Sequence, residues 1–354
     1  MTAAAPARDL RKALIGRTFM HPVLDYLLIG SVISIAFTAY VVVKPELYQN
    51  ADFTVMMIVI LLANSAHFSS STVRLYTIPG ASQTWPMLTL VFPLLALGAL
   101  TVCLVDSDLL GPQLQALYLS WSPFHFARQG YGLSVMYSYR SGCILSERDK
   151  QLLHQAALLP FYYVIIMAGD AGIDWLLPTA VLRSWPIQAL RDVTEVVGRP
   201  LAVIAPFLVF AKVWRSPSGP MPVIALLCVL TTTMWFVILD PLNAFVWATI
   251  FHGIQYLAII LVFHVKERVA EPDNRHSGLY HALWFYGATL VLAYLLFHAL
   301  PAAFVWAGMG FVQSKVAVIA GINIHHFIVD GFIWKFKAGG ANRKVVDEKI
   351  PAPA

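Results

Sequence analysis

The chain has little charge for its length and almost no cysteine. Charged residues make up 12% of its 354 residues and hydrophobic residues 58%, and the mean hydropathy is +0.69. Soluble domains carry about a quarter charged residues, so this composition excludes an ordinary soluble domain and predicts an integral membrane protein. The three cysteines, Cys103, Cys143 and Cys228, lie far apart in the sequence. Their spacing excludes a disulfide framework and a thiolate metal site.

Familiar catalytic and targeting motifs are missing too. The sequence contains no P-loop, GxSxG, HExxH or CxxC pattern, and it lacks the clustered HxxxH and HxxHH boxes of membrane desaturases and hydroxylases. The basic N-terminal segment has neither the apolar core nor the cleavage site of a signal peptide. The net charge of +5 is explained by Lys and Arg in cytoplasmic loops. We therefore expect no nucleic-acid partner.

Long apolar runs dominate what is present. A helix needs about 20 mostly apolar residues to cross a bilayer. The sequence predicts an all-α, polytopic helical bundle with about ten transmembrane helices. The expected spans are residues 22–43, 52–70, 85–105, 112–137, 152–170, 199–215, 220–240, 243–265, 279–300 and 312–334.

The distribution of Lys and Arg predicts the orientation of these spans. Most basic residues fall in segments that a ten-span count places on the cytoplasmic side, which is the pattern of the positive-inside rule. We therefore expect a multi-pass protein of the cell membrane with both termini in the cytoplasm. Residues 1–340 would form a single transmembrane domain and residues 341–354 a cytoplasmic tail. The connection at 171–198 mixes Trp with Arg and Asp, as in a helix that lies in the interface.

Histidines inside the apolar runs are the main functional signal. Ionisable residues are expensive within a membrane, so each is a functional hypothesis by default. Counted from the nearest basic residue, His67, His326, His252 and His125 lie at depths of roughly 10, 14, 21 and 22 Å. This spread exceeds the size of one metal site, but span boundaries carry errors of about two to four residues. We expect the four histidines to form one buried metal centre, with the adjacent His325 as a further ligand or a separate contact.

Polar residues lie three or four positions before or after the histidines. Residues three or four apart share a helix face, and metal-ligating imidazoles commonly donate their second nitrogen to such a partner. The residues expected to orient the histidines in this way are Asn64, Gln129, Gln255 and Asn323.

Two charged residues complete the candidate site. Asp330 follows His326 by one turn, so its carboxylate could accept the imidazole N–H or bind the metal. Arg128 neighbours His125 near mid-membrane and needs an anion, either Asp330 or a group of the substrate. We expect both residues to be catalytic.

Imidazole suits iron, copper and zinc, and haem held by a histidine pair is an alternative cofactor. Oxidation of a hydrophobic substrate by dioxygen best justifies a metal in apolar surroundings, so we expect Fe(II), with lipid and dioxygen as partners. Intramembrane histidines also line the pathways of proton-coupled transporters, or they act only in packing. Both of these readings stay open.

Two segments carry a family resemblance. The last apolar run, IAGINIHHFIVDGFIWKF, and the segment ANSAHFSSS resemble histidine motifs of the bacterial membrane-embedded β-carotene dioxygenases related to bacterio-opsin accessory proteins. The resemblance implies a polytopic protein with an iron held by intramembrane histidines. It also implies that His67 and His326 are ligands and that a carotenoid or similar lipid is the substrate.

Overall fold

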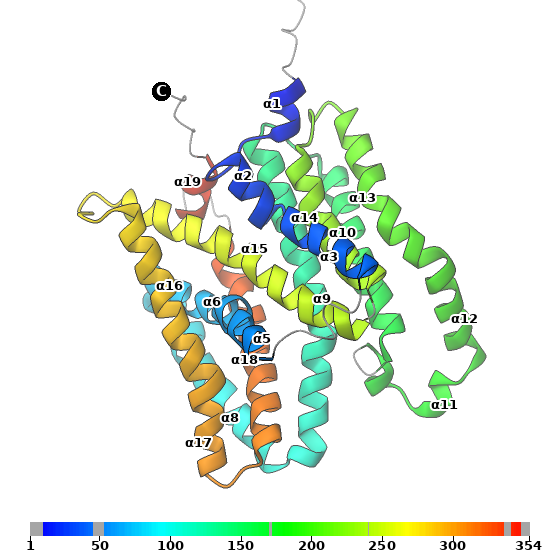
Figure 1. The fold of residues 1–354 in the computed structure, drawn as a ribbon, viewed down its shortest axis with the longest axis vertical. Coiled ribbons are helices and arrows are strands. Elements are labelled where there is room, and N and C mark those ends of the chain that lie inside the picture. The colour runs from blue at the N-terminus through cyan, green and yellow to red at the C-terminus, as the bar shows by residue number, and fades with distance from the viewer. Residues whose placement is uncertain (1–9, 45–52, 170–171, 240, 336–340, 348–354) are drawn as a thin grey trace, which may run out of the picture.

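The computed structural model describes residues 10–44, 53–169, 172–239, 241–335 and 341–347. These residues form helices and turns and contain no strand, so the predicted all-helical fold is confirmed for this part of the chain (Figure 1). The expected tail beyond 347 and the first nine residues lie outside the described residues.

Most of the chain is α-helical, interrupted by short π-helical turns. The α-helices are α1 Leu10–Ile15, α2 Pro22–Leu24, α3 Val32–Val43, α5 Phe53–Val59, α6 Ala66–Thr77, α7 Ala81–Thr84, α8 Phe92–Val105, α9 Ser107–Arg140, α10 Glu147–Met167, α11 Thr179–Leu182, α12 Trp185–Val193, α13 Arg199–Trp214, α14 Val223–Thr233, α15 Pro241–Val269, α16 Gly278–Tyr294, α17 Leu300–Trp306, α18 Phe311–Ile333 and α19 Ala341–Asp347. The π-helical turns are η1 Asp25–Ile29, η2 Ile60–Ser65, η3 Met87–Val91, η6 Thr194–Gly198, η7 Met234–Ile238 and η8 Leu295–Ala299, and η5 Asp174–Leu176 is a 3₁₀ turn.

Six helices in the described ranges are long and apolar enough to cross a membrane. They are Thr54–Thr77, Met87–Val105, Trp185–Trp214, Phe245–Val269, Gly278–Trp306 and Phe311–Ile333. Pro22–Ile29 and Val32–Val43 form a pair bent by 48°, which gives a seventh candidate if it is one span. A count of ten spans is therefore not confirmed. α9, α10 and Val223–Ile238 are helical where spans were expected, but they do not meet the same measure of length and hydropathy.

The segment before α13 differs from its expected form. α12, η6 and α13 form one continuous helix, Trp185–Trp214, instead of an interfacial helix followed by a short span. The side chain of Trp185 at its start is 81% exposed. The sequence placed a boundary at residue 199, between the interfacial connection and the next span. Because apolar residues extend across this position, the helix continues through it.

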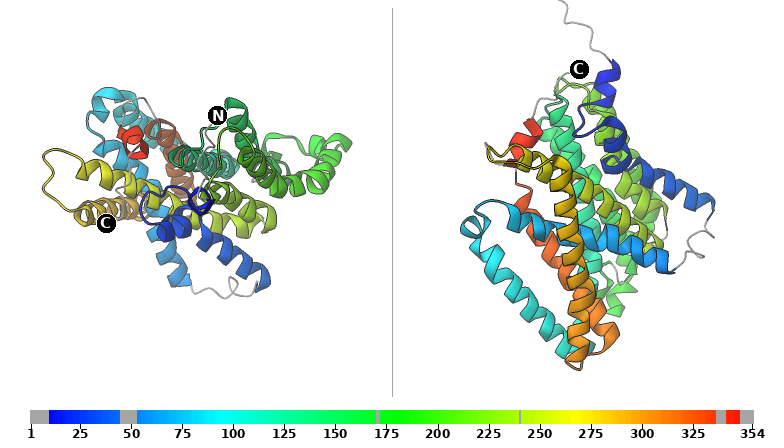
Figure 2. Two further views of the ribbon diagram at one scale, coloured as in Figure 1. Left: turned by 90° about the horizontal axis from the view of Figure 1, so that it is seen from above. Right: turned by 60° about the vertical axis from the view of Figure 1, so that its left-hand side comes forward.

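Four elements meet at the centre of the molecule: η2 with α6, α9, α15 and α18. They are not parallel, because α15 crosses α9 and α18 obliquely (Figure 1) and η2 with α6 runs across the long axis of the molecule (Figure 2, right). Gly253 permits the closest approach. A Cβ there would lie 2.8 Å from the Ala63 carbonyl oxygen and 3.3 Å from the His67 Cβ, so α15 could not pack this tightly on η2 with a larger residue.

The described chain ends lie at the same end of the molecule, where α1 and α19 are found (Figure 1). α19 is docked by hydrogen bonds. The Asn342 side chain donates to the Ile333 carbonyl oxygen, and the Arg140 guanidinium donates to the carbonyl oxygens of Val345 and Val346. Residues 341–347 are therefore packed against the helical bundle.

Candidate metal centre

Four histidines from four helices come together where these elements cross. His67 of α6, His125 of α9, His252 of α15 and His326 of α18 each offer a ring nitrogen, and these nitrogens all lie within 4.8 Å of one another. All four residues are buried, and three of them are 0% exposed. The structure thus brings together the four histidines that the sequence singled out, and the group could hold a metal ion.

The π-helical turn η2 directly precedes this part of α6 and helps to place His67. It ends at Ser65, and Ala66 is the only residue between the turn and the histidine. A π-turn inserts an extra residue and so changes the direction in which later side chains point, and such turns are frequent at functional sites. Together with the Gly253 contact, it brings His67 and His252 to a ring-centroid separation of 4.7 Å.

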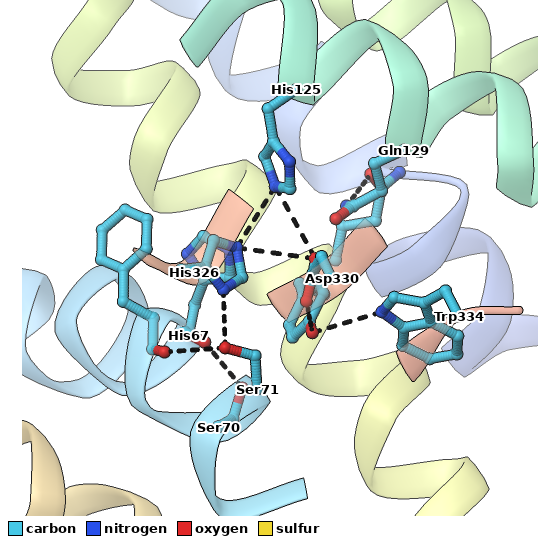
Figure 3. A network of polar contacts seen from close by, with 11 residues as sticks. His67, Ser70, Ser71, His125, Gln129, His326, Asp330 and Trp334 are labelled. Carbon is cyan, nitrogen blue, oxygen red and sulfur yellow. Dashed lines mark hydrogen bonds and ion pairs between the residues drawn. The ribbon is translucent and has the colours of Figure 1, made fainter. Parts of the chain in front are cut away.

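His326 is held in one orientation by hydrogen bonds on both ring nitrogens (Figure 3). Its Nδ1 lies 2.8 Å from the Ser71 hydroxyl oxygen, and its Nε2 lies 3.2 Å from Nε2 of His125. A hydroxyl on the outer nitrogen fixes the ring and its tautomer in metal sites. The inner nitrogen is therefore the one directed at His125 and the centre of the group.

Asp330 faces the same pair of histidines. Its Oδ2 is 3.6 Å from His326 Nε2 and 3.9 Å from His125 Nε2. The Tyr256 hydroxyl donates to Oδ1 at 2.5 Å and itself accepts from the Trp334 indole at 3.2 Å. Oδ1 of the carboxylate is thus held by a hydrogen bond, and Oδ2 faces the histidines of the centre.

The hydrogen bond from Tyr256 to Asp330 was not expected from the sequence. The available signal was its position four residues after His252, on the same face of α15. A tyrosine at that spacing is more often a packing residue, so spacing alone gave little reason to select it.

The polar residues expected to orient the histidines bond elsewhere. The Gln129 amide donates to Gln255 at 2.8 Å, and Gln255 donates in turn to the Ile29 carbonyl oxygen and the Ser31 hydroxyl. Asn323 donates to the Ile319 carbonyl oxygen on its own helix. The Asn64 amide oxygen is buried without a hydrogen-bond partner. The side chains of Gln129, Gln255 and Asn323 therefore donate to groups other than the histidine rings.

His325 and Arg128 also differ from expectation. His325 stacks on Phe92, with ring centroids 4.9 Å apart and an interplanar angle of 12°, and it does not belong to the four-histidine group. This follows from the rotation of about 100° between consecutive helical residues. The Arg128 guanidinium contacts Nε2 of His154 at 2.7 Å, and no ion pair joins it to Asp330 within the described chain.

The donor set fits a metal ion, and two of the histidines need one. Both ring nitrogens of His67 and of His252 are buried without a hydrogen-bond partner. Buried polar atoms are normally paired, and an unpaired one is costly. Metal–imidazole bonds of about 2.0–2.1 Å hold the nitrogens of a four-coordinate ion about 3.3 Å apart, close to the 3.2 Å between His125 and His326. A single ion would therefore satisfy one orphaned nitrogen on each of these two rings.

A cavity of about 950 Å³ reaches this centre from one side. His125 and Asp330 are the members of the centre that line it, together with Tyr256. Its wall beside them is aromatic, formed by Trp121, Phe124 and Phe327. The volume is that of a binding pocket for a small molecule, and it gives an apolar ligand access to His125 and Asp330.

No family model, curated protein or solved structure matches this chain. The described residues form an all-helical fold with six helices long and apolar enough to cross a membrane, and a buried four-histidine group lies within it.

Proposed function

We propose that the protein is a membrane-embedded non-haem iron oxidoreductase that oxidises a hydrophobic substrate, such as a carotenoid or another lipid, with dioxygen. It would lie in the cell membrane with both termini in the cytoplasm. The observation that carries the proposal is the buried four-histidine group with orphaned ring nitrogens, opening through His125 and Asp330 into an apolar cavity.

The choice of chemistry follows from the surroundings of the group. Zinc has no redox chemistry, whereas iron bound by imidazoles can activate dioxygen. The bilayer dissolves both dioxygen and lipids, and a dry site protects reactive species from water. If both oxygen atoms enter the product, as in a dioxygenase, no separate reductant is required. The resemblance of the His67 and His326 segments to β-carotene dioxygenases supports the same class.

Some residues of the site would bind the metal or the substrate, and others would position those residues. Ser71 fixes the ring of His326, and Tyr256 fixes the carboxylate of Asp330. Asp330 would serve as a further ligand or hold a proton beside the reacting atoms. The aromatic wall of the cavity would orient the substrate and exclude water.

The geometry favours a bare ion over the alternatives. A haem requires an open plane between its two axial histidines, and here four imidazole nitrogens lie within 4.8 Å of one another. A proton-coupled carrier would need its histidines to be accessible to water in turn, whereas His67, His252 and His326 are each 0% exposed.

Metal analysis of the purified protein tests the proposal. We expect about one iron per chain, and we expect it to be lost in His67→Ala and His326→Ala, because each removes a ligand that no other described side chain replaces. His276→Ala is the control, since His276 is exposed and stacks on Tyr280 away from the centre. Metal content is measured by elemental analysis and dioxygen uptake with an oxygen electrode.

Protein that is folded, active and free of metal would contradict the proposal. A visible spectrum of the same sample separates the haem alternative, because a haem gives an intense absorption band that mononuclear imidazole-bound iron does not.

A further inference from the structure

The cavity has a second feature, at the end opposite its aromatic wall. Three cations from three different elements line it there: Lys150 near the start of α10, Lys335 just after α18 and Arg343 on α19. Asp330 is the single carboxylate among the described residues that line the cavity, and it lies at the histidine centre. A fourth cation, Arg128, also lines the cavity beside His125, where its charge is offset by that of Asp330. The cavity therefore has three cations at one end, whereas the end at the centre carries one cation, one carboxylate and His125.

These cations are poorly neutralised by the protein itself. Lys335 forms no ion pair with a described carboxylate, and its ammonium group lies over the Phe332 ring at 4.5 Å. Lys150 pairs with Glu147 at 2.7 Å, but the Glu147 side chain is 84% exposed, and exposed pairs of this kind contribute little. Arg343 pairs with Asp347, whose side chain is 45% exposed. An anion that entered this end would meet cations available to bind it.

The wall between the two ends is mainly apolar. Leu133, Met136 and Ile259 line this stretch of the cavity. Lys335 lies nine residues after His326 and just beyond the end of α18, and the seven residues from His326 to Ile333 alone correspond to roughly 10 Å of helix. A ligand that contacts both these cations and His125 must therefore be elongated, with an apolar body.

We propose that the substrate is an anionic amphiphile: a long apolar chain with a carboxylate or phosphate head group. The head binds at Lys150, Lys335 and Arg343, and the chain runs along the apolar wall so that one of its carbons reaches the centre at His125 and Asp330. Charge sets this orientation, because three cations attract an anionic head at one end, whereas at the centre the attraction of the single cation Arg128 is opposed by the Asp330 carboxylate. The inference rests on the proposed function and narrows its substrate class.

Basic residues are common at the cytoplasmic ends of membrane helices. That rule alone would place lysines and arginines near the end of the cavity where Lys150, Lys335 and Arg343 lie. It does not require them to converge on one cavity. Lys344, directly beside Arg343, is exposed and does not line the cavity. It therefore provides a matched control of the same charge on the same helix.

Binding of three amphiphiles of equal chain length tests the proposal. The wild-type protein is placed in nanodiscs of neutral phosphatidylcholine, and empty nanodiscs are subtracted. Labelled palmitate, hexadecanol and hexadecyltrimethylammonium are titrated in turn. We expect palmitate to bind about tenfold or more tightly than hexadecanol, as for one charge-assisted hydrogen bond, and the cationic amphiphile to bind most weakly. Hexadecyl phosphate should behave like palmitate, since the head-group charge is what is recognised.

Variants then locate the head group. Lys335→Gln should remove most of the preference for palmitate, and the double variant with Lys150→Gln should remove it entirely, whereas hexadecanol binding and metal content stay unchanged. Lys344→Gln should bind all three ligands as the wild type does. If Arg128→Gln had a larger effect than Lys335→Gln, the anion would bind beside the centre, and the proposed orientation would be wrong.

Metal analysis of the same samples keeps this inference separate from the proposed function. Protein that holds metal but binds palmitate and hexadecanol equally would overturn the substrate class alone. Protein that prefers palmitate but holds no metal would overturn the metal-dependent function and leave the anion site in place.

Discussion

At the scale of single residues, Asp330 is the side chain whose chemistry the site depends on most after the histidines. It is buried, its Oδ1 accepts from Tyr256 at 2.5 Å, and its Oδ2 faces the ring nitrogens of His125 and His326. A buried carboxylate is costly without a partner. The surroundings of Asp330 supply one hydrogen-bond donor, so a cation at the centre would be its natural second partner.

We predict that Asp330→Asn folds but loses metal affinity or turnover by about 10–100-fold, the usual cost of losing an outer partner of a metal site. The amide keeps the shape and can still accept from Tyr256, so the change removes mainly the charge. Asp330→Glu should recover little, because the longer side chain displaces the oxygens. Metal affinity is measured by competition with a chelator, and turnover by dioxygen uptake.

Tyr256→Phe serves as the comparison for this prediction. It frees Oδ1 but keeps the charge, so we expect a smaller effect on metal affinity than from Asp330→Asn. Wild-type metal content and turnover in Asp330→Asn would show that the carboxylate is only a packing element and would argue against its role at the centre.

The sequence predicted the residues of the centre better than their hydrogen bonds. His67, His125, His252 and His326 could be selected because ionisable residues in apolar runs are expensive. Their partners could not be selected in the same way, because a residue's nearest polar neighbour is often on another helix. Ser71 lies four residues after His67, yet its hydroxyl contacts His326 of α18. Spacing along one helix does not contain that information.

At the scale of the elements, the helix crossing explains how histidines at different expected depths meet. Depths counted along each helix are comparable only if the helices are parallel. α15 and η2 with α6 run obliquely to α9 and α18 (Figures 1 and 2), and the π-helical turn η2 shifts the count before His67. The expected spread of about 12 Å, at 1.5 Å per residue, therefore contracts to nitrogens within 4.8 Å.

We predict that Gly253→Ala weakens the centre without replacing a ligand. The added methyl group would lie 2.8 Å from the Ala63 carbonyl oxygen and 3.3 Å from the His67 Cβ, so α15 must move away from η2. Small residues permit such close helix contacts in membranes, and overpacking costs about 1–3 kcal/mol. Because the displacement separates His67 from His252, metal content should fall together with thermal stability, as measured by elemental analysis and a melting curve.

Gly287→Ala on α16 is the matched control. A Cβ at Gly287 meets no atom within 4 Å, and alanine is the better helix former, so stability and metal content should be unchanged or slightly higher. If Gly253→Ala retained full metal content, the close packing of α15 on η2 would not be what positions the two histidines.

At the scale of the whole molecule, the number of spans depends on three helices that hydropathy alone does not assign. The six candidates and the bent pair at residues 22–43 become ten if α9, α10 and Val223–Ile238 also cross the membrane. These helices pack against one another in the bundle. α9 carries His125 and part of the polar cavity wall. Such polar residues lower the mean hydropathy of a helix, even where neighbouring helices cover it. The helices that carry His67, His252 and His326 meet the measure of length and hydropathy, whereas α9 does not.

We predict that α9 spans the membrane and that both termini are cytoplasmic. α9 has 34 residues, which corresponds to roughly 50 Å of helix and exceeds the bilayer core of about 30 Å. Its C-terminal Arg140 bonds to α19 at the end of the molecule where α1 also lies. Reporters inserted after Asp106 and after Gly142 should therefore report opposite sides, with Gly142 cytoplasmic. Gly142 lies in the turn between α9 and α10, and no atom lies within 4 Å of its Cβ position.

Two further insertions complete the test. Reporters after Lys44 and in the α17–α18 turn at Gly308 should share the outer side with Asp106, whereas a fusion after Arg343 should share the cytoplasmic side with Gly142. The turn at Gly308 lies at the end of the molecule away from α1 and α19 (Figure 1), so it controls for insertion itself. If Asp106 and Gly142 reported the same side, α9 would not cross the membrane. His125 would then approach the centre from a re-entrant helix, and the cytoplasmic placement of the cationic cavity end at Lys335 would have to be determined independently of the ten-span count.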